Sequence, residues 1–149
     1  MSTLTTASQP ETACDCFCAT VRKASRAITQ FYDEQLASTG LLTTQYSLLS
    51  NVARHGPIAI SALADAMAMD RTTLTRNLKP LIAARLIGIG SDGDRRRRMV
   101  TITPKGQAAY AQARPRWTKA QKLFTARFGE ERSRQLDELL AATIEGLRS

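Results

Sequence analysis

Four consecutive arginines, Arg95 to Arg98, are the densest charge in the chain. They follow a Gly/Asp turn and precede a run in which Val100 and Ile102 face one way and threonines the other. Such alternation after a turn predicts the second strand of a hairpin, and Leu86–Ile89 can supply the first. Guanidinium groups concentrated at the tip of a thin ribbon repel one another unless a bound anion neutralises their charge. A nucleic acid is the polyanion that fits, and a solvated turn is the alternative.

The charge distribution extends this interpretation beyond the arginine run. The chain has 149 residues, a formal net charge of +8 and a pI near 10.0. Residues 71–98 contain eight cationic side chains and two aspartates, so this stretch holds six of the eight net charges. Charge focused on one segment indicates a binding face.

The elements upstream of the ribbon predict a short strand, Ile58–Ile60, followed by a helix-turn-helix. Ser61 is expected to cap a brief helix over Ala62–Met67, and Asp70 to cap a second helix from Arg71 to about Ala84. In the second helix the residues expected to face inward are Leu74, Leu78, Leu81 and Ile82, and those expected to face outward are Arg71, Thr72, Thr73, Thr75, Arg76 and Lys79. Two short helices with a Thr/Arg outer face, followed by a hairpin, form a winged helix-turn-helix.

Four further segments complete the predicted architecture, which is mostly α with a small β-hairpin wing. Amphipathic helices are expected over Thr12–Ala37 and from Thr43 or Thr44, a plausible N-cap, to Arg54. Thr103 should cap a long helix that Pro115 kinks or splits, and Glu130–Arg148 forms the last helix. The outer helices have more apolar surface than one winged lobe can cover, which favours a two-fold dimer.

Composition limits the class of protein. The length suits one domain, no apolar run could span a bilayer, and the Ser/Thr-rich start is unlike a secretory signal. Three closely spaced cysteines, Cys14, Cys16 and Cys18, favour reduced thiols in the cytoplasm over a disulfide framework. With a single histidine and no catalytic motif, the chain is not expected to be an enzyme or to need a cofactor.

Several motifs resemble the MarR family of bacterial winged-helix transcription regulators. They are Leu63-Ala64, the segment Met69 to Leu78, Asp94-Arg95-Arg96 and the segment Val100 to Gly106. The resemblance implies a dimer that straddles a pseudo-palindromic operator in double-stranded DNA, and most members are repressors released by a small ligand or by oxidation. Composition and length predict a disordered tail over 1–11 and one domain over 12–149. The resemblance implies that 12–37 and 104–149 are dimerisation helices and that 43–103 is the DNA-binding lobe. The sequence departs from the family at Arg85, where glycine is frequent.

The resemblance also assigns roles in DNA binding. Thr72, Thr73 and Arg76 match the positions that face the major groove. Asp94 and Arg96 match the family's Asp-x-Arg wing, in which the carboxylate orients a guanidinium that enters the minor groove. The other wing arginines, Arg95, Arg97 and Arg98, are expected to contact flanking phosphates.

The cysteines leave three readings open: inert packing residues, a thiol sensor, or a site for a soft metal or arsenite. Cys18 and Tyr32 match the reactive cysteine and one supporting tyrosine of the family's hydroperoxide sensors, whereas Arg22 and Thr43 replace two other tyrosines. Arg22, one turn from Cys18, could lower the pKa of its thiol.

A ligand pocket is expected between the dimer helices and the winged lobe, for a small phenolic or other aromatic effector. Its candidate residues are Phe31, Tyr32, Tyr46, His55 and Trp117. The sequence thus predicts a dimeric DNA-binding regulator, with a sequence-indifferent nucleic-acid-binding or architectural protein as the alternative.

Overall fold

The computed structural model describes residues 16–91, 93 and 97–148. Its elements, in chain order, are α1 (Phe17–Leu36), the 3-10 helix η1 (Ala37–Thr39), α2 (Thr43–His55), β1 (Ile58–Ala59), α3 (Ile60–Ala66), α4 (Arg71–Ala83), β2 (Ile87–Ser91), β3 (Arg98–Ile102), α5 (Pro104–Phe128) and α6 (Glu130–Leu147). The expected tail over 1–11 lies outside the described residues. No helix in the described part is long and apolar enough to cross a membrane.

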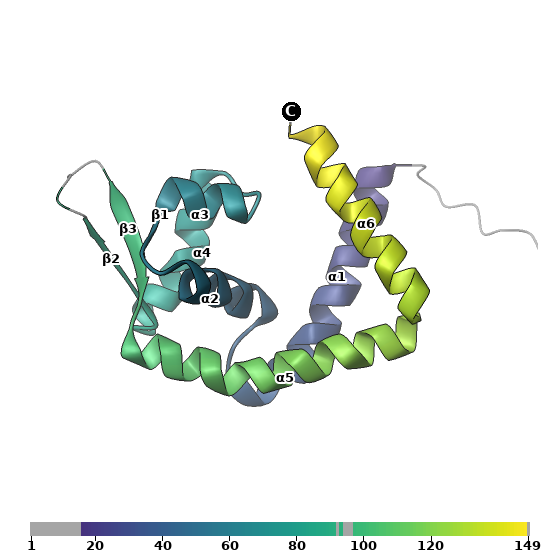
Figure 1. Cartoon of the computed structure of the whole chain (residues 1–149), viewed down its shortest axis with the longest axis horizontal. Helices are drawn as coiled ribbons and strands as arrows, with labels where there is room; N and C mark the ends of the chain where they lie inside the picture. The colour runs from purple at the N-terminus through teal and green to yellow at the C-terminus, as the bar shows by residue number, and fades with distance from the viewer. Residues whose placement is uncertain (1–15, 92, 94–96, 149) are drawn as a thin grey trace, which may run out of the picture.

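The long helix α5 connects two differently built parts of the molecule (Figure 1). At one end α2, α3, α4 and the sheet pack into a lobe, and at the other end α1 and α6 extend away from α5. The core lies mainly in the lobe, where the fully buried side chains include Leu48, Leu49, Val52, Leu63, Leu74, Leu78, Leu81 and Val100. The predicted winged helix-turn-helix is therefore confirmed as a fold.

The apolar stripe of α4 was predicted correctly with one exception. Leu74, Leu78 and Leu81 are buried, whereas Ile82 is 38% exposed. Ile82 lies one residue, or about 100°, around the helix from Leu81, and this places it at the edge of the buried arc. Its expected inward position was wrong.

The sheet has three strands, because the short strand expected at Ile58–Ile60 joins the predicted two-stranded ribbon as β1. β3 pairs antiparallel with β2 and also with β1, so that Val100 lies opposite both Ile58 and Ile89. The predicted alternation holds, since Val100 is buried. β1 pairs with β3 directly before α3 begins, and it thereby holds the base of the wing against the helices.

Helix caps were predicted with mixed success. Asp70 Oδ1 accepts a hydrogen bond from Thr73 N at 2.8 Å, and Thr103 Oγ1 accepts one from Gly106 N at 3.0 Å, as expected. Ser61 lies inside α3, and its predicted capping role is wrong. Thr43 also lies inside its helix and is not the N-cap of α2. Leu42 takes that position, and Gln45 Oε1 accepts a hydrogen bond from Leu42 N.

Pro115 does not split the long helix, contrary to one of the two outcomes expected from the sequence. α5 runs without a break from Pro104 to Phe128. A proline removes one N–H donor from the helix, and the rest of this long segment retains its hydrogen-bond ladder.

Among the residues that the structure describes, two that are not glycine adopt left-handed backbone conformations, and both follow the end of a helix in the helix-turn-helix lobe. Ala68 has φ 52° and Arg85 has φ 60°. After α4, Arg85 N donates to Ile82 O and Leu86 N donates to Leu81 O, both at 2.9 Å. This pair of bonds is the Schellman motif, whose left-handed position favours glycine. The departure from the family at Arg85 therefore falls where a side chain is least favourable.

We expect Arg85→Gly to raise the free energy of unfolding by about 1 kcal/mol, because glycine adopts the left-handed conformation without a Cβ penalty. Arg85→Ala is the matched control, since it removes the charge but keeps the Cβ atom. Thermal denaturation should show a higher midpoint for the glycine variant than for the alanine variant. Equal midpoints would show that backbone strain at Arg85 is negligible.

Candidate nucleic-acid interface

The outer face of α4 presents a row of polar and cationic side chains. The helix is held by its buried leucine face on one side and by the Asp70 cap at its start. The residues on its opposite side line a shallow depression of about 440 Å³ and are all exposed: Arg71, Thr72, Thr75, Arg76 and Lys79. A rigid helix with three cations and two hydroxyls on one face suits contacts with phosphates and base edges.

Thr73 is positioned differently from the other predicted contact residues. It is partly buried, and its hydroxyl donates to Asp70 Oδ2 at 2.7 Å. Hydrogen bonds from Thr73 lower the pKa of Asp70, so this cap stays ionised at neutral pH. The hydroxyl of Thr75 donates to Arg71 O at 2.7 Å, whereas that of Thr72 makes no hydrogen bond within the described residues. The geometry therefore favours Thr72 over Thr73 as a free donor.

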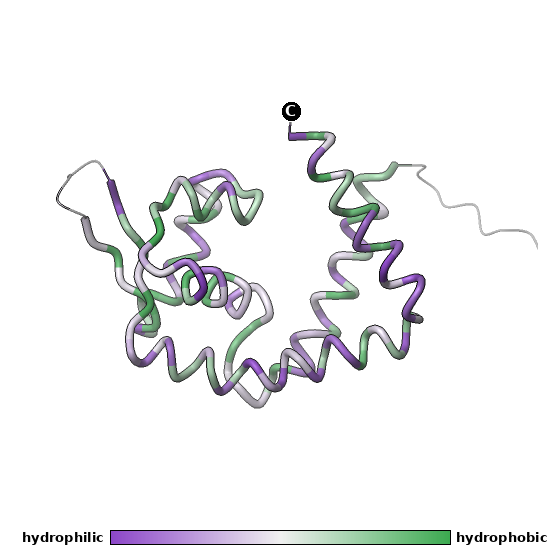
Figure 2. Tube along the Cα trace, in the orientation of Figure 1, coloured by the Kyte–Doolittle hydropathy of each residue, from purple (hydrophilic) through white to green (hydrophobic). Residues whose placement is uncertain are grey.

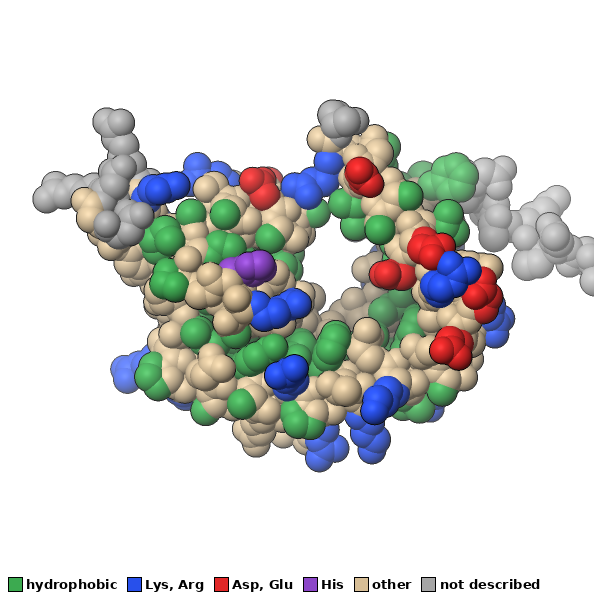
Figure 3. Space-filling view, in the orientation of Figure 1, with side chains coloured by type: hydrophobic (Ala, Val, Ile, Leu, Met, Phe, Trp, Pro, Cys, Tyr) green, Lys and Arg blue, Asp and Glu red, His purple; other side chains and the backbone are tan. Residues whose placement is uncertain are grey.

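The wing lies beside the α3–α4 pair. β2 ends at Ser91 and β3 begins at Arg98, and these two residues pair across the hairpin. Both strand ends lie at the end of the lobe away from α5 (Figure 1), where Figure 3 shows Lys and Arg side chains gathered. Arg97 and Arg98 are exposed. The predicted pair Asp94 and Arg96, together with Arg95, lies outside the described residues.

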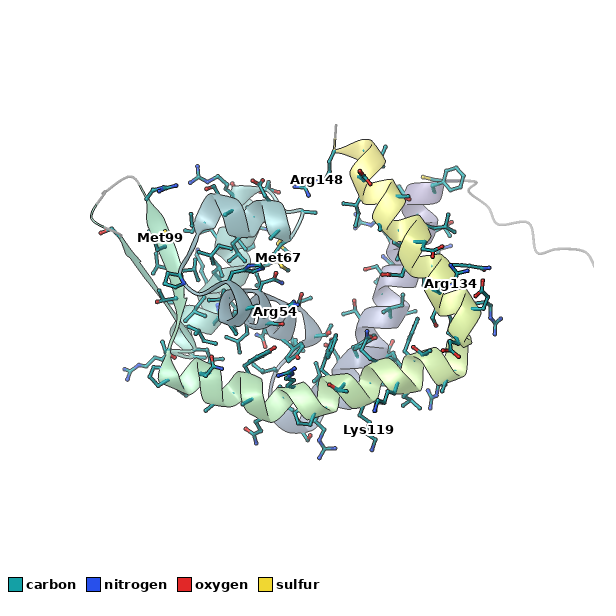
Figure 4. All side chains as sticks on the ribbon, viewed as in Figure 1. Arg54, Met67, Met99, Lys119, Arg134 and Arg148 are labelled. Carbon is teal, nitrogen blue, oxygen red and sulfur yellow. The ribbon has the colours of Figure 1, made fainter. Side chains whose placement is uncertain are left out.

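A second concentration of positive charge, on α5, was not among the sequence predictions. The helix α5 contains no acidic residue and six cationic ones: Lys105, Arg114, Arg116, Lys119, Lys122 and Arg127. Lys105 Nζ donates to Ala84 O at 3.0 Å and so ties α5 to the end of α4. Figure 4 shows Lys119 pointing away from the lobe. The absence of any acidic residue between Asp94 and Glu130 was visible in the sequence and could have revealed this concentration of charge.

Three of the five predicted pocket residues meet in one cavity. Tyr32, Tyr46 and Trp117 line a space of about 260 Å³ between α1, α2 and α5. The remaining lining residues are Ile28, Thr29, Thr43, Ser47, Ser50 and Arg54. Arg54, which was not among the predicted pocket residues, adds a cation to a cavity otherwise lined by aromatic, aliphatic and hydroxyl groups.

Tyr46 is the central residue of this cavity. Its ring stacks between Tyr110 and Trp117, with centroid distances of 5.6 and 5.7 Å. Burial, followed by the influence of Tyr110, raises the pKa of Tyr46 to about 12. The phenol is therefore a neutral hydrogen-bonding group at physiological pH.

Phe31 and His55 do not line this cavity. Phe31 contacts Tyr32 and Phe124 edge to face and lies under the guanidinium of Arg127, in a separate apolar depression. His55 is the exposed last residue of α2. Adjacent residues of a helix point about 100° apart, which separates Phe31 from Tyr32 and His55 from Arg54.

Cys16 and Cys18 lie at the start of α1, far from the aromatic residues that line the cavity. Cys16 and Cys18 are exposed, and Cys14 lies outside the described residues. Cys18 and Tyr32 are fourteen residues apart in one helix, or about 21 Å along its axis. Tyr32 therefore cannot contact Cys18 of the same chain. Within the residues that the structure describes, no three His, Cys, Asp or Glu side chains are placed to hold a metal ion.

Comparison with known proteins gives a consistent picture. A sequence profile described as MarR family matches residues 39–97, which run from η1 into the wing. The crystal structure of the M. tuberculosis transcriptional regulator MosR in complex with DNA is 34% identical, with a TM-score of 0.78 over 91% of this chain and 100% of that one. A mutant of E. coli MarR complexed with operator DNA shares the fold at 18% identity, with a TM-score of 0.74 over 85% of this chain and 91% of that one.

A curated relative matches over a shorter stretch. The HTH-type transcriptional repressor NicR of Pseudomonas putida is 32% identical over 89 residues, or 59% of this chain. The matched stretch spans about half of that relative, 56% of its length.

Proposed function

Because this chain belongs to the MarR family of winged helix-turn-helix regulators, we propose that it is a transcriptional regulator that binds double-stranded DNA as a homodimer, most simply as a repressor. The exposed face of α4, held rigidly beside the wing, carries this proposal. The structural likeness to MosR in complex with DNA supports it.

Exposed apolar surface on α1 and α6 supports the dimer. Phe17 is 89% exposed and Leu147 is 82% exposed, and Val21, Leu139, Leu140 and Ile144 are also exposed. Figure 2 shows hydrophobic residues along both helices, outside the lobe. Apolar surface of this extent favours burial against another molecule, and a second copy offers the same surface. We therefore propose 12–37 and 104–149 as dimerisation helices and 43–103 as the DNA-binding lobe.

The proposal is tested by a binding titration with operator and non-cognate duplexes, after genome-wide mapping of bound DNA has identified the operator. A regulator should prefer its operator by about 10³-fold or more. The alternative, a sequence-indifferent nucleic-acid-binding protein, has some support from the cations of α5. This alternative predicts similar affinities for the operator and the non-cognate duplex, with both affinities determined by the salt concentration alone.

The wing arginines provide a more local test. We expect the double variant Arg97→Ala/Arg98→Ala to lower the slope of log K against log salt by about two units, one for each lost phosphate contact. The matched control is Lys119→Ala/Lys122→Ala, which removes the same charge from α5. An unchanged slope for the wing variant, or an equal fall for both variants, would contradict phosphate binding by the wing.

We further propose that an effector controls DNA binding. The cavity lined by Tyr32, Tyr46 and Trp117 suits a small aromatic molecule, and Arg54 would favour an anionic group on it. Because Trp117 lines the cavity, ligands that enter it should change tryptophan fluorescence. A candidate effector that lowers operator affinity without changing this fluorescence would act elsewhere.

Thiol oxidation is the second form of control that we propose. Cys16 and Cys18 are accessible, and Arg22 is one helical turn from Cys18. Mass spectrometry after alkylation, with and without peroxide, should show peroxide-dependent loss of alkylation. Equal alkylation of the thiols under both conditions would show that they have no sensing role.

A further inference from the structure

Two methionines hold the turn of the helix-turn-helix by their sulfur atoms. Met67 ends α3, Met69 precedes the Asp70 cap of α4, and the left-handed residue Ala68 lies between them. Asn51 Nδ2, from α2, donates to Met67 Sδ at 3.2 Å. Asn77 Nδ2, from α4, lies 3.6 Å from Met69 Sδ in the same kind of contact. The turn between α3 and α4 is thus connected through sulfur to α2 and to α4.

The amide of Asn51 and the backbone of the turn are held by further hydrogen bonds. Asn51 Nδ2 also donates to Ser47 O at 2.9 Å, which fixes its side chain on α2. In the turn, Ala68 N donates to Asp65 O and Met69 N donates to Ala64 O, at 3.1 and 2.9 Å. Both methionines pack against the core and are only partly buried, so an oxidant can reach them. Figure 4 shows Met67 at the end of α3.

We propose that Met67 and Met69 are an oxidative modification site, and that their conversion to sulfoxides lowers DNA affinity. The reactant is a hydroperoxide: the sulfur gives two electrons to the O–O bond, one oxygen atom is transferred to sulfur, and the hydroperoxide leaves as the alcohol or water. At 3.2 Å there is no room for an oxygen atom between Met67 Sδ and the amide nitrogen. An oxygen on the side of sulfur that faces Asn51 therefore displaces this amide, and an oxygen on the other side adds a polar group to a side chain that packs against the core.

The effect on DNA binding follows from the position of the turn. α4 is oriented by its contacts with α3 and by the Asp70 cap, which follows Met69 directly. Displacing the turn moves the exposed face of α4 relative to the wing, and a binding face tolerates only small displacements. This control is independent of Cys16 and Cys18, which lie at the start of α1. It rests on the proposed DNA-binding function.

The test uses full-length protein in which the three cysteines are replaced, C14S/C16S/C18S, so that only methionine responds. After hydroperoxide treatment, operator affinity should fall about tenfold or more, and methionine sulfoxide reductases should restore it. The variant that adds Met67→Leu and Met69→Leu keeps side chains of similar size without sulfur, and should lose less than about twofold. The control Met99→Leu, in β3, should respond like the cysteine-free parent. Peptide mass spectrometry follows oxidation at each methionine.

Two results would overturn the proposal: protein with both methionines oxidised that keeps its affinity, or a double leucine variant that loses as much as its parent. Treatment that leaves Met67 and Met69 unoxidised while converting Met99 would also overturn the site. If untreated protein does not distinguish operator from other DNA, the proposed function fails instead. In that case thermal denaturation tests the modification. Oxidation should lower the denaturation midpoint of the cysteine-free parent but not that of the double leucine variant.

Discussion

Arg76→Ala is expected to weaken operator binding by about 1–3 kcal/mol, or roughly 5- to 150-fold, if the guanidinium reads a base in the major groove. The side chain is exposed on the outer face of α4, beside Thr72 and Lys79. It makes no hydrogen bond or ion pair with any residue that the structure describes, so its loss should leave the fold intact.

The measurement is a titration of the same variant with operator and with non-cognate duplex. A base contact predicts that the ratio of the two affinities falls, whereas a phosphate contact predicts that both affinities fall together. Arg116→Ala is the matched control, because it removes an exposed arginine from α5. Parent-like operator affinity for Arg76→Ala would show that α4 is not used as proposed.

Gly106→Ala is expected to destabilise the protein by about 3 kcal/mol, at the upper end of the usual range for overpacking. A Cβ atom on Gly106 would lie 1.9 Å from Leu86 O, 2.8 Å from the Leu86 carbonyl carbon and 2.9 Å from Ile102 Cγ1. The nearest atoms belong to backbone that cannot move freely. Leu86 N donates to Leu81 O at 2.9 Å, and Leu86 O accepts from Thr103 N at 3.0 Å.

The matched control for this substitution is Gly90→Ala in β2, where an added Cβ would have no neighbour within 4 Å. We expect that variant to be neutral or to gain about 0.5 kcal/mol from the reduced flexibility of the unfolded chain. Chemical denaturation should separate the two variants clearly. Coincident midpoints would mean that the junction of α4, the wing and α5 can open to accept a side chain.

Local patterns in the sequence were sufficient for the helix-turn-helix and for the strands of the wing. The leucine spacing of α4, the cap at Asp70 and the Thr103-Pro104 start of α5 all appear in the structure as predicted. Each depends on residues within about one helical turn of each other, so the chain carries the information locally. The same reasoning predicted the outward face of α4.

Contacts between distant segments decided the rest. The pairing of β1 with β3 joins residues about forty positions apart, and no local pattern specifies it. The division of the aromatic residues between a cavity at Tyr46 and a cluster at Phe31 depends on how α1, α2 and α5 cross. The sequence by itself determined which helix presents threonine and arginine side chains on its outer face. Only the tertiary structure decided that Asn51 and Asn77 reach the sulfurs of the turn beside that helix, because this requires α2, α3 and α4 to pack together.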